Sequence, residues 1–408
     1  MSQFTHNDLI ILLTTIGGIL ILARIIGELG RKFKFPIVMG EILVGILLGP
    51  TVVGTISPDF FERVFPMDGN VSIAFDGLVN LSVVLLLFVA GLEVQLPLVL
   101  KQGKTAIYTG FFSMIIPFAT GFAAAYYFPG LLGIGEGNHD LFFSIFMGTA
   151  LSVSALPVIA RILMDMNLFK SSIGMLIIAA AMFNDLIAWL IFSFLLAIKN
   201  SQASLGVGYT ILYILGFGLF MLTIGKKFID RSLPWVQTKL SWPGGVLSIS
   251  IGICLLCAAF TQKINIHAIL GAFICGIAFG DSVHLHEKAR EIIHQFITNF
   301  FAPLFFVSIG LRVNFAENFD AMVVGVVLVL AYFGKVFGAT LGAYLGGIKL
   351  NNAIAVGFGL NARGAMEIIL GTLALSAGII SPKIFVAIVV MALVTSLTSA
   401  PMIRKFIS

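Results

Sequence analysis

The chain has 408 residues, of which 59% are hydrophobic and only 11% are charged. A soluble domain carries about 25% charged residues, so this composition excludes a soluble enzyme, a nucleic-acid-binding protein and a disordered chain. The formal net charge is +5 at pH 7, and in a membrane protein such an excess reflects lysine and arginine in cytoplasmic loops. The sequence therefore predicts an all-α protein that crosses a membrane many times.

The apolar residues fall into thirteen segments joined by short connections. A helix needs about 20 apolar residues to cross the hydrocarbon core of a bilayer. The first segment is too long for a cleavable signal and ends in basic residues, and we expect no soluble C-terminal domain. The predicted spans are residues 8–30, 36–54, 73–93, 105–128, 140–164, 172–198, 207–225, 244–262, 266–282, 294–311, 320–346, 353–377 and 384–402.

The basic residues predict how these segments are oriented. Fifteen of the 24 lysines and arginines lie in loops that follow odd-numbered segments, and five lie in loops on the other side. Because short cytoplasmic loops are enriched in lysine and arginine, the odd loops are expected inside. This places the N-terminus outside and the C-terminus in the cytoplasm, with the protein in the cell (inner) membrane.

Two pairs of segments share a glycine pattern at the same offset. Gly45 of the second segment corresponds to Gly276 of the ninth, and Gly91 of the third corresponds to Gly310 of the tenth. The offset of seven segments is odd, so the two copies cross the membrane in opposite directions. Inverted repeats are typical of secondary transporters, whose sites lie near the midplane between the repeats. We expect a first repeat at 1–206, a linker helix at 207–239 and a second repeat at 240–408.

The same offset pairs the segments at 140–164 and 353–377, which are both interrupted by polar residues and helix breakers. Non-helical backbone at membrane depth is tolerated only where protein or a water-filled cavity satisfies it. We therefore expect two crossed, discontinuous helices around an ion site, in preference to ordinary kinking. The interrupting residues are Thr149, Ser152, Ser154 and Pro157 in the first segment and Asn361, Arg363, Gly364 and Glu367 in the second.

Asp185 is the fourteenth residue of the segment at 172–198 and so lies at mid-membrane. A carboxylate there costs several kcal/mol unless it is protonated, paired or hydrated. Such a group can bind either a proton or a small hard cation, which is the requirement for exchange on one site. Its neighbour Asn184 offers an oxygen ligand or an interhelical hydrogen bond but cannot titrate.

Several further charged residues lie within the segments, and four of them bear on the site. Lys335 is central in its segment, where it can titrate, repel a cation or serve a structural role. Arg363 and Glu367 are spaced i, i+4, so we expect a structural pair on one helix face rather than direct contact with the ion. Glu41 lies early in the second segment and either lines an inner funnel or bonds to a neighbouring helix.

Cysteines and histidines predict no metal site. Cys254 and Cys257 form a C-x-x-C without a second pair or a nearby histidine. His284, His286 and His294 lie in a charged stretch that we interpret as an amphipathic surface helix, for which a pH-sensing role stays open. No cofactor is expected, and the metal ion at Asp185 would be the transported monovalent cation.

Several stretches of the chain resemble the second branch of the monovalent cation/proton antiporter superfamily, including plant cation/H+ exchangers and bacterial Na+(K+)/H+ exchangers. The resemblance covers nearly the whole chain and implies a thirteen-helix homodimer, with a dimerisation domain and a six-helix core that moves as an elevator. It also implies that Asp185 is the aspartate that binds the ion and the proton. The matching stretches are residues 40–50, 86–93, 150–163, 184–185, 334–335 and 361–367.

The chain departs from one pattern of this superfamily. Some prokaryotic relatives carry two adjacent aspartates, the first of which pairs with a lysine of a later helix. Here Asn184 holds that first position while Lys335 is kept, so the lysine lacks its carboxylate partner. This departure favours an electroneutral exchange of one proton for one cation.

We expect a secondary active transporter that exchanges protons for Na+ or K+ by alternating access and serves pH homeostasis. A gated K+ channel is the alternative, which proton coupling would separate from an antiporter. A retinal-type photoreceptor, with Lys335 as Schiff base and Asp185 as counterion, is opposed by thirteen spans and an inverted repeat. The sequence leaves Na+ and K+ both open.

Overall fold

The computed structural model describes residues 4–32, 37–66, 68–94, 103–134, 140–166, 168–169, 171–200, 207–264, 267–282 and 284–407. Within these ranges all regular elements are helical, which confirms the predicted all-α class. The chain divides into two compact units, one of residues 1–94 and 211–318 and the other of residues 95–210 and 319–408. Each unit therefore combines a segment from the first half of the chain with one from the second.

The first unit holds the N-terminal helices together with helices from the middle of the chain. Its elements are α1 (His6–Lys32), α2 (Ile37–Leu48), α3 (Val53–Ile56), α4 (Pro58–Val64), α5 (Asn70–Glu93), α11 (Val207–Phe220, whose first residues precede the unit), the π-helical turn η2 (Met221–Gly225), α12 (Lys226–Lys239), α13 (Gly244–Lys263), α14 (Ala268–Gly280), α15 (Glu287–Phe296), the π-helical turn η3 (Ile297–Phe301) and α16 (Ala302–Arg312).

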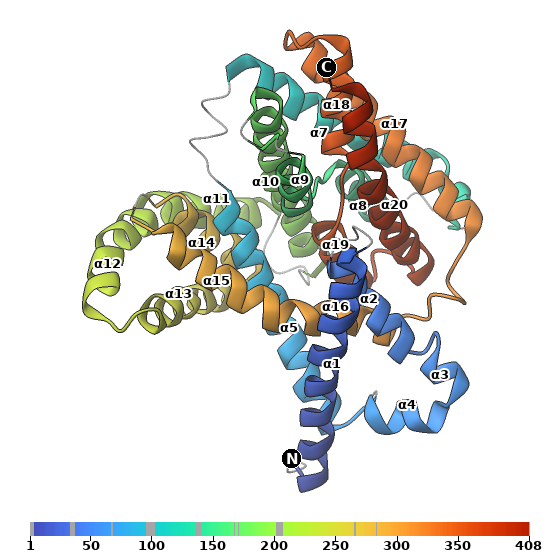
Figure 1. Ribbon diagram of the computed structural model, residues 1–408, viewed down its shortest axis with the longest axis vertical. Coiled ribbons are helices and arrows are strands. Elements are labelled where there is room, and N and C mark those ends of the chain that lie inside the picture. The colour runs from blue at the N-terminus through green and yellow to red at the C-terminus, as the bar shows by residue number, and fades with distance from the viewer. Residues whose placement is uncertain are drawn as a thin grey trace. The chain divides into compact units, whose positions relative to one another are not determined.

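The second unit places green α8 to α10 beside orange and red α17 to α20 (Figure 1). Side-chain caps explain where two of its helices begin. Asp140 accepts from the Phe142 amide at 2.8 Å at the start of α8, and Asp320 does so from the Met322 amide at 3.0 Å at the start of α17. Its elements are α7 (Gly103–Tyr127), the 3-10 turn η1 (Pro129–Leu132), α8 (Leu141–Ser152), α9 (Leu156–Asp165), α10 (Ser172–Asn200), α17 (Ala321–Leu345), α18 (Leu350–Leu360), α19 (Ala365–Ser376) and α20 (Pro382–Phe406).

Each of the thirteen predicted spans has a helical counterpart, but they are not equally long. Among the described residues, ten helices are long and apolar enough to cross a membrane, and α18 with α19 forms an eleventh span bent by 46°. The segments around α8 and α14 are shorter, at 12 and 13 residues. Because these helices are short, the count of thirteen spans stays a prediction. The breaks in the segments at 140–164 and 353–377 lie where polar residues and helix breakers interrupt the sequence.

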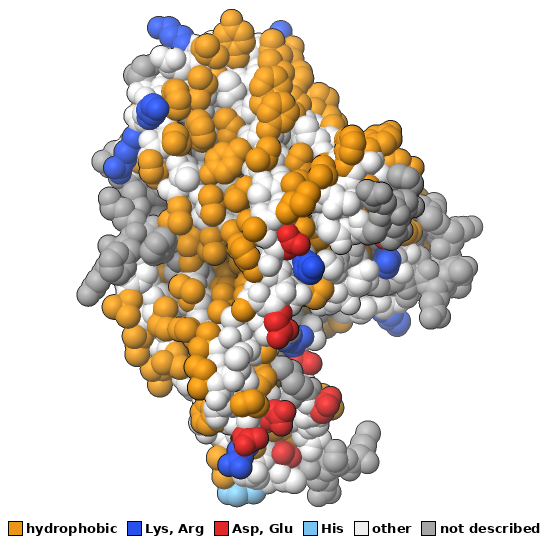
Figure 2. All heavy atoms as spheres, turned by 90° about the vertical axis from the view of Figure 1, so that its right-hand side faces the viewer, with side chains coloured by type: hydrophobic (Ala, Val, Ile, Leu, Met, Phe, Trp, Pro, Cys, Tyr) orange, Lys and Arg blue, Asp and Glu red, His pale blue; other side chains and the backbone are white. Residues whose placement is uncertain are grey.

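The surface of the protein is unusually apolar. In Figure 2 hydrophobic side chains dominate the visible face, and charged side chains occupy fewer places. On α17, Val329, Phe333 and Phe337 are 67%, 60% and 50% exposed at four-residue spacing. A soluble protein rarely exposes a row of large apolar side chains, so this face of α17 fits contact with lipid.

Glycines bring the backbones of the first unit together in two places. A Cβ atom added at Gly45 of α2 would meet the Gly310 Cα of α16 at 3.0 Å, and one added at Gly276 of α14 would meet the Gly91 Cα of α5 at 2.9 Å. Small residues allow such close approach between membrane helices. The glycines that the sequence pattern singled out are therefore the contact points of α2 with α16 and of α5 with α14.

A glycine ladder joins α7 and α17 in the second unit. Added Cβ atoms at Gly334, Gly342 and Gly346 would each lie 2.8 Å from the nearest Cα atoms of Pro117, Thr109 and Thr105 on α7. Gly338 stands between Gly334 and Gly342, and Gly346 directly follows α17, so intervals of four keep these glycines on one face. Lys335 directly follows Gly334, so the close contact of Gly334 with α7 sets the position of the Lys335 backbone.

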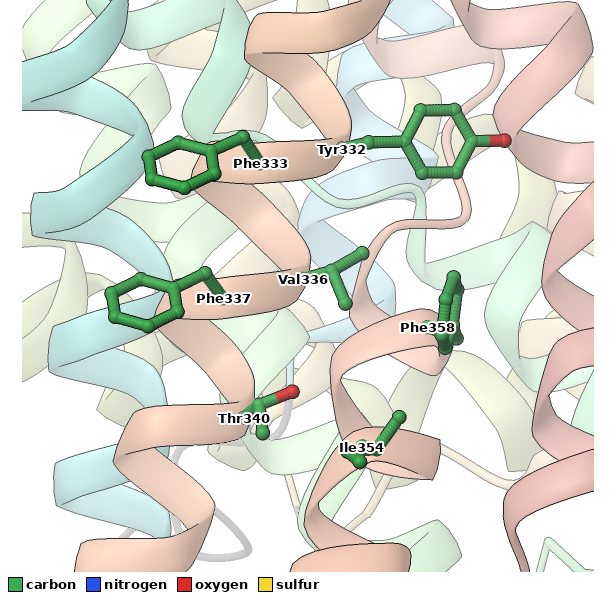
Figure 3. Close-up of a pocket in the computed structure, with 7 residues that line it drawn as sticks. All are labelled: Tyr332, Phe333, Val336, Phe337, Thr340, Ile354 and Phe358. Atoms are coloured by element: carbon green, nitrogen blue, oxygen red, sulfur yellow. The ribbon is translucent and has the colours of Figure 1, made fainter.

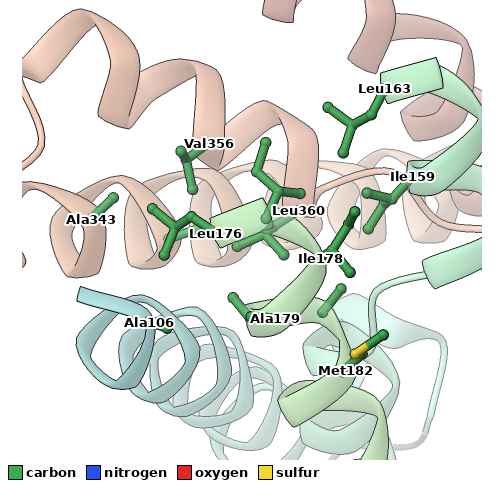
Figure 4. Packing of buried hydrophobic residues seen from close by; sticks show 14 of the residues in the cluster. Ala106, Ile159, Leu163, Leu176, Ile178, Ala179, Met182, Ala343, Val356 and Leu360 are labelled. Carbon is green, nitrogen blue, oxygen red and sulfur yellow. The ribbon is translucent and has the colours of Figure 1, made fainter. Parts of the chain in front are cut away.

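An apolar cluster packs α7, α9, α10, α17 and α18 together (Figure 4). Leu176 and Ile178 of α10 lie against Ile159 of α9 and against Val356 and Leu360 of α18. These side chains are at most 4% exposed, and each contributes about 1.5–3 kcal/mol by burial. The cluster thereby joins α9, the second half of the first broken segment, to α18, the first half of the second.

Candidate functional site

The first break separates α8 from α9. Helix α8 ends at Ser152, residues 153–155 are non-helical, and α9 begins at Leu156. Pro157 stands in the first turn of α9, where proline is tolerated because its missing N–H would have no helical acceptor. The Ser154 amide lies outside both helices and donates to Asp185 Oδ1 at 3.3 Å. Asp185 on α10 is only 4% exposed, so this carboxylate faces the break from inside the unit.

The second break separates α18 from α19 and crosses the first. The Ala155 amide donates to the Ala362 carbonyl at 3.1 Å, and the Ser154 hydroxyl donates to the Leu360 carbonyl at 2.9 Å. A Cβ added at Gly364 would lie 2.8 Å from Val158 Cγ2, so a larger residue there would displace the Val158 side chain. The two broken segments predicted from the sequence therefore meet, with Ser154 bonded to both Asp185 and the second break.

The C-terminal end of α8 is capped by two buried cations. The last carbonyls of a helix accept no hydrogen bond within it and carry the negative end of the helix dipole. Arg363 donates from its two terminal nitrogens to the Ala150 carbonyl at 2.8 Å and the Leu151 carbonyl at 2.6 Å. Lys335 Nζ donates to the Ser152 carbonyl. Both basic side chains are fully buried, so the helix end supplies the hydrogen-bond acceptors that they require.

Asn184 is the second partner of Lys335. In the amide orientation that satisfies its neighbours, Asn184 donates to the Gly110 carbonyl at 2.9 Å and accepts from Ser113 Oγ at 2.8 Å and from Lys335 Nζ at 3.0 Å. The neutral amide thus occupies the place where a carboxylate would face the lysine. Lys335 is held by one carbonyl and one amide oxygen, and neither of them titrates.

Other predicted residues lie near the crossing but use their polar atoms on backbone. Thr149 Oγ1 donates to the Ile145 carbonyl at 2.7 Å, and Ser152 Oγ donates to the Gly148 carbonyl at 2.7 Å. A hydroxyl that donates in this way keeps its oxygen lone pairs for another donor or a cation. Asn361 is fully buried, and among the described residues neither its Oδ1 nor its Nδ2 has a hydrogen-bond partner.

The expected ion pair between Arg363 and Glu367 is not among the ion pairs of the described residues. Arg363 lies in the non-helical break, so the i, i+4 geometry of a helix does not apply to it. Glu367 Oε2 instead accepts from the Gly364 amide at 2.8 Å and caps α19. Glu41 belongs to the first unit, where it is 4% exposed on α2.

Three contacts escaped the sequence analysis. Ser113 supports Asn184, Ser396 of α20 donates to the Arg363 carbonyl, and Tyr332 of α17 shares a hydrogen bond with Thr398. Each is a single hydroxyl in an apolar helix, and such residues are common without any role in a site. Only the tertiary contacts distinguish them.

The charged stretch is helical from Glu287 onward as α15, which continues through η3 into α16, and of the three histidines only His294 lies in this helix. His294 Nε2 lies 3.5 Å from Glu93 Oε1, and His284 Nδ1 lies 3.8 Å from Asp230 Oδ1. His267 accepts from the Ile269 amide at the start of α14. The side chains of Pro157 and Arg161 lie outside the described set, as do Lys34, Lys101 and Lys170, which contributed to the orientation prediction.

A cavity of about 420 Å³ lies between α17 and α18 (Figure 3). Val336 points toward Ile354 and Phe358 of α18, while Phe333 and Phe337 lie on the other side of α17. All seven lining residues are uncharged. A small cation needs oxygen ligands, so the crossing of the breaks fits an ion better than this cavity does.

Comparison with known proteins identifies the family of this chain. Residues 17–405 match the family described as "Sodium/hydrogen exchanger, transmembrane". The Na(+)/H(+) antiporter NhaS4 of Synechocystis sp. is 31% identical over 404 residues, covering 98% of each chain. Cation/H(+) antiporter 17 of Arabidopsis thaliana is 31% identical and K(+)/H(+) antiporter 1 of Saccharomyces cerevisiae is 30% identical.

The chain spans about half the length of the plant and yeast relatives, 48% and 45% respectively. The solved structure of the sodium proton antiporter MjNhaP1 from Methanocaldococcus jannaschii matches with a TM-score of 0.66 and 16% identity, over 98% of this chain and 99% of that one. The predicted class of transporter rather than enzyme is thereby confirmed. The chain belongs to the sodium/hydrogen exchanger family of the monovalent cation/proton antiporter superfamily.

Proposed function

We propose that this protein exchanges protons for Na+ or K+ by alternating access, with Asp185 as the shared binding site. The observation that carries the proposal is the hydrogen bond from the Ser154 amide to Asp185 Oδ1 at the crossing of the two breaks. Broken helices at mid-membrane are where secondary transporters bind ions. A protonated Asp185 and a cation-bound Asp185 are both neutral, so one carboxylate can carry either ion in turn.

The ligands we propose for the cation are Asp185 and oxygens of the first break. Ser152, Ser154 and Thr149 donate to backbone carbonyls, which leaves their lone pairs for a cation. Asn361 is buried without a protein partner among the described residues, so its amide oxygen is a further candidate. Asn184 acts through Lys335, and we assign it a positioning role.

We propose that exchange is electroneutral, with one proton for one cation. Lys335 and Arg363 hold the carbonyl end of α8, and we infer that both keep their protons throughout the cycle. Asn184 adds no charge. Asp185 is then the one group at the crossing that we expect to titrate, since Glu367 is tied to the Gly364 amide.

Further parts of the proposal concern the whole molecule. Under the offset of seven segments, α2 corresponds to α14 and α5 corresponds to α16. The contact of α2 with α16 therefore corresponds to the contact of α14 with α5, which supports repeats at 1–206 and 240–408 joined by a linker at 207–239. We propose a homodimer in the inner membrane, with the N-terminus outside, an elevator-like movement of the unit that contains Asp185, and a role in pH homeostasis.

The test is cation-dependent proton exchange in proteoliposomes, measured by fluorescence quench with Li+, Na+, K+ and Rb+ at several pH values. Asp185→Asn keeps the shape of the side chain, and we expect it to exchange no faster than protein-free liposomes. Asp320→Asn is the matched control, because asparagine also caps a helix and this residue lies in the same unit. Normal exchange by a folded Asp185→Asn variant contradicts the single-site mechanism, and cation flux without proton coupling favours a channel.

A further inference from the structure

Helices α11 and α12, joined by η2, form one continuous span from Leu212 to Lys239 with an exposed apolar row. Leu215, Leu219, Ile224 and Phe228 are 64%, 68%, 60% and 66% exposed. Their spacing of about one helical turn keeps them on one side of the helix. Within a membrane, this side faces lipid acyl chains.

The same side becomes cationic as the helix ends. Lys227, Arg231, Trp235 and Lys239 follow one another at four-residue intervals, and all four are exposed. Trp242 follows, 46% exposed. Tryptophan and long basic side chains gather where a membrane span reaches the headgroup layer, because lysine and arginine extend their charges to that layer while their stems stay in apolar surroundings.

The opposite side of α12 is fixed to the rest of the first unit. Lys226 forms an ion pair with Asp281, and Asp230 accepts a hydrogen bond from Ser282. Gln237 donates to the His284 carbonyl at 2.7 Å. The acidic groups beside α12 are thus engaged on its inner side, and the exposed Lys227, Arg231 and Lys239 have no ion-pair partner in the described part of the chain.

We propose that Lys227, Arg231 and Lys239 form a binding surface for the headgroup of an anionic phospholipid. The apolar row that leads into the surface would contact the acyl chains of the same lipid, and the guanidinium of Arg231 matches the geometry of a phosphate. A second copy of this chain would bring an identical row of cations, so like charges disfavour that occupant. This surface is independent of the exchange mechanism.

Trp235 lies within the cationic row, so lipid enrichment can be measured directly. Purified protein is reconstituted in phosphatidylcholine vesicles that contain about 10% of a lipid brominated near the headgroup, either phosphatidylglycerol or phosphatidylcholine. Bromine quenches tryptophan fluorescence only at short range. Each basic residue near an anionic headgroup favours binding about fivefold, so brominated phosphatidylglycerol should quench clearly more than brominated phosphatidylcholine, and raised salt should reduce the difference.

The triple variant Lys227→Gln, Arg231→Gln, Lys239→Gln should be quenched equally by the two lipids. The control triple variant Lys349→Gln, Arg404→Gln, Lys405→Gln removes three exposed basic residues from the other unit and should keep the wild-type difference. Equal quenching of the wild type by both lipids overturns the proposal. A preference for phosphatidylglycerol that survives the first triple variant overturns it as well, as does shielding of Trp235 from both lipids by a second copy.

Discussion

Lys335 Nζ lies 3.0 Å from the amide oxygen of Asn184 and also donates to the Ser152 carbonyl. The lysine therefore connects α17, α10 and the end of α8 through neutral oxygens. A buried ammonium is stabilised only by what it donates to, and here those partners are reinforced by the negative end of a helix dipole. We therefore propose that Lys335 fixes the position of the break at the end of α8.

The first prediction is that exchange is independent of membrane voltage. If Asp185 alone titrates, one proton replaces one cation and no net charge crosses. Proteoliposomes held at about −100 mV with K+ and valinomycin, with Na+ as test cation, should exchange within about twofold of the rate at 0 mV. One net charge per cycle would instead shift the equilibrium by about 2.3 kcal/mol at that voltage, or roughly fiftyfold, and such a shift would refute electroneutrality.

The second prediction concerns Lys335 itself. Lys335→Gln keeps an N–H donor for the Ser152 carbonyl while removing the charge, so we expect a less stable protein that still exchanges and stays insensitive to voltage. Lys335→Ala removes the donor and should lose more stability and most of the exchange. The melting temperature in detergent and the quench assay measure the two effects. A Lys335→Gln variant that is as stable as the wild type but has no exchange would show that the lysine takes part in proton transfer.

The third prediction is that replacing Arg363 disrupts the structure of the break between α8 and α9. Its two hydrogen bonds to Ala150 and Leu151 carry a charged donor, and each is worth about 1.5–3 kcal/mol. Arg363→Gln should therefore lower the melting temperature and abolish exchange, with Arg363→Lys in between. Arg404→Gln, on the exposed side of α20, is the control and should change neither. A stable, inactive Arg363→Gln would instead indicate that Arg363 acts in the exchange cycle itself.

The fourth prediction tests the glycine ladder of α17 with one substitution at two places. Gly342→Ala adds a Cβ that would lie 2.8 Å from the Thr109 Cα, so it should destabilise the protein by about 1–3 kcal/mol. Gly325→Ala lies on the same helix with nothing within 4 Å, and it should be neutral or stabilising by up to about 1 kcal/mol. Equal effects in thermal unfolding would show that the ladder is not a tight contact.

Local features of the sequence predicted much of this site. Apolar runs located the helices, and polar residues beside Pro157 and Gly364 located both breaks, because such residues cannot continue a helix in lipid without other partners. In the structure the Ser154 amide of the first break donates to Asp185 Oδ1 at 3.3 Å. Residues that violate the local pattern were therefore the informative ones.

Long-range partners were not predictable in this way. The spacing of Arg363 and Glu367 suggested an ion pair, but Arg363 reaches the carbonyls of α8, more than 200 residues earlier in the chain. Ser113 and Ser396 carry no pattern at all. Each compact unit also combines part of one predicted repeat with part of the other. A local motif identifies a helix but does not identify the helices that it packs against.

The last prediction converts the neutral partner of Lys335 into a charged one. Asn184→Asp places a carboxylate where the amide oxygen lies 3.0 Å from Lys335 Nζ, so the two groups can form an ion pair while no cation is bound. A cation bound between the introduced carboxylate and Asp185 would weaken that pair and favour release of a second proton. Exchange by this variant should therefore depend on voltage, with two protons for one cation.

The variant is measured in the same proteoliposomes at 0 and about −100 mV, with Asn351→Asp as control. Asn351 is exposed near the start of α18, so the control adds the same charge away from the crossing and should stay voltage-insensitive. Combining Asn184→Asp with Lys335→Gln removes the group that would release the second proton, and the voltage dependence should then disappear. An Asn184→Asp variant that exchanges well but ignores voltage would show that Lys335 keeps its proton even beside a carboxylate, and stoichiometry would then be set by Asp185 alone.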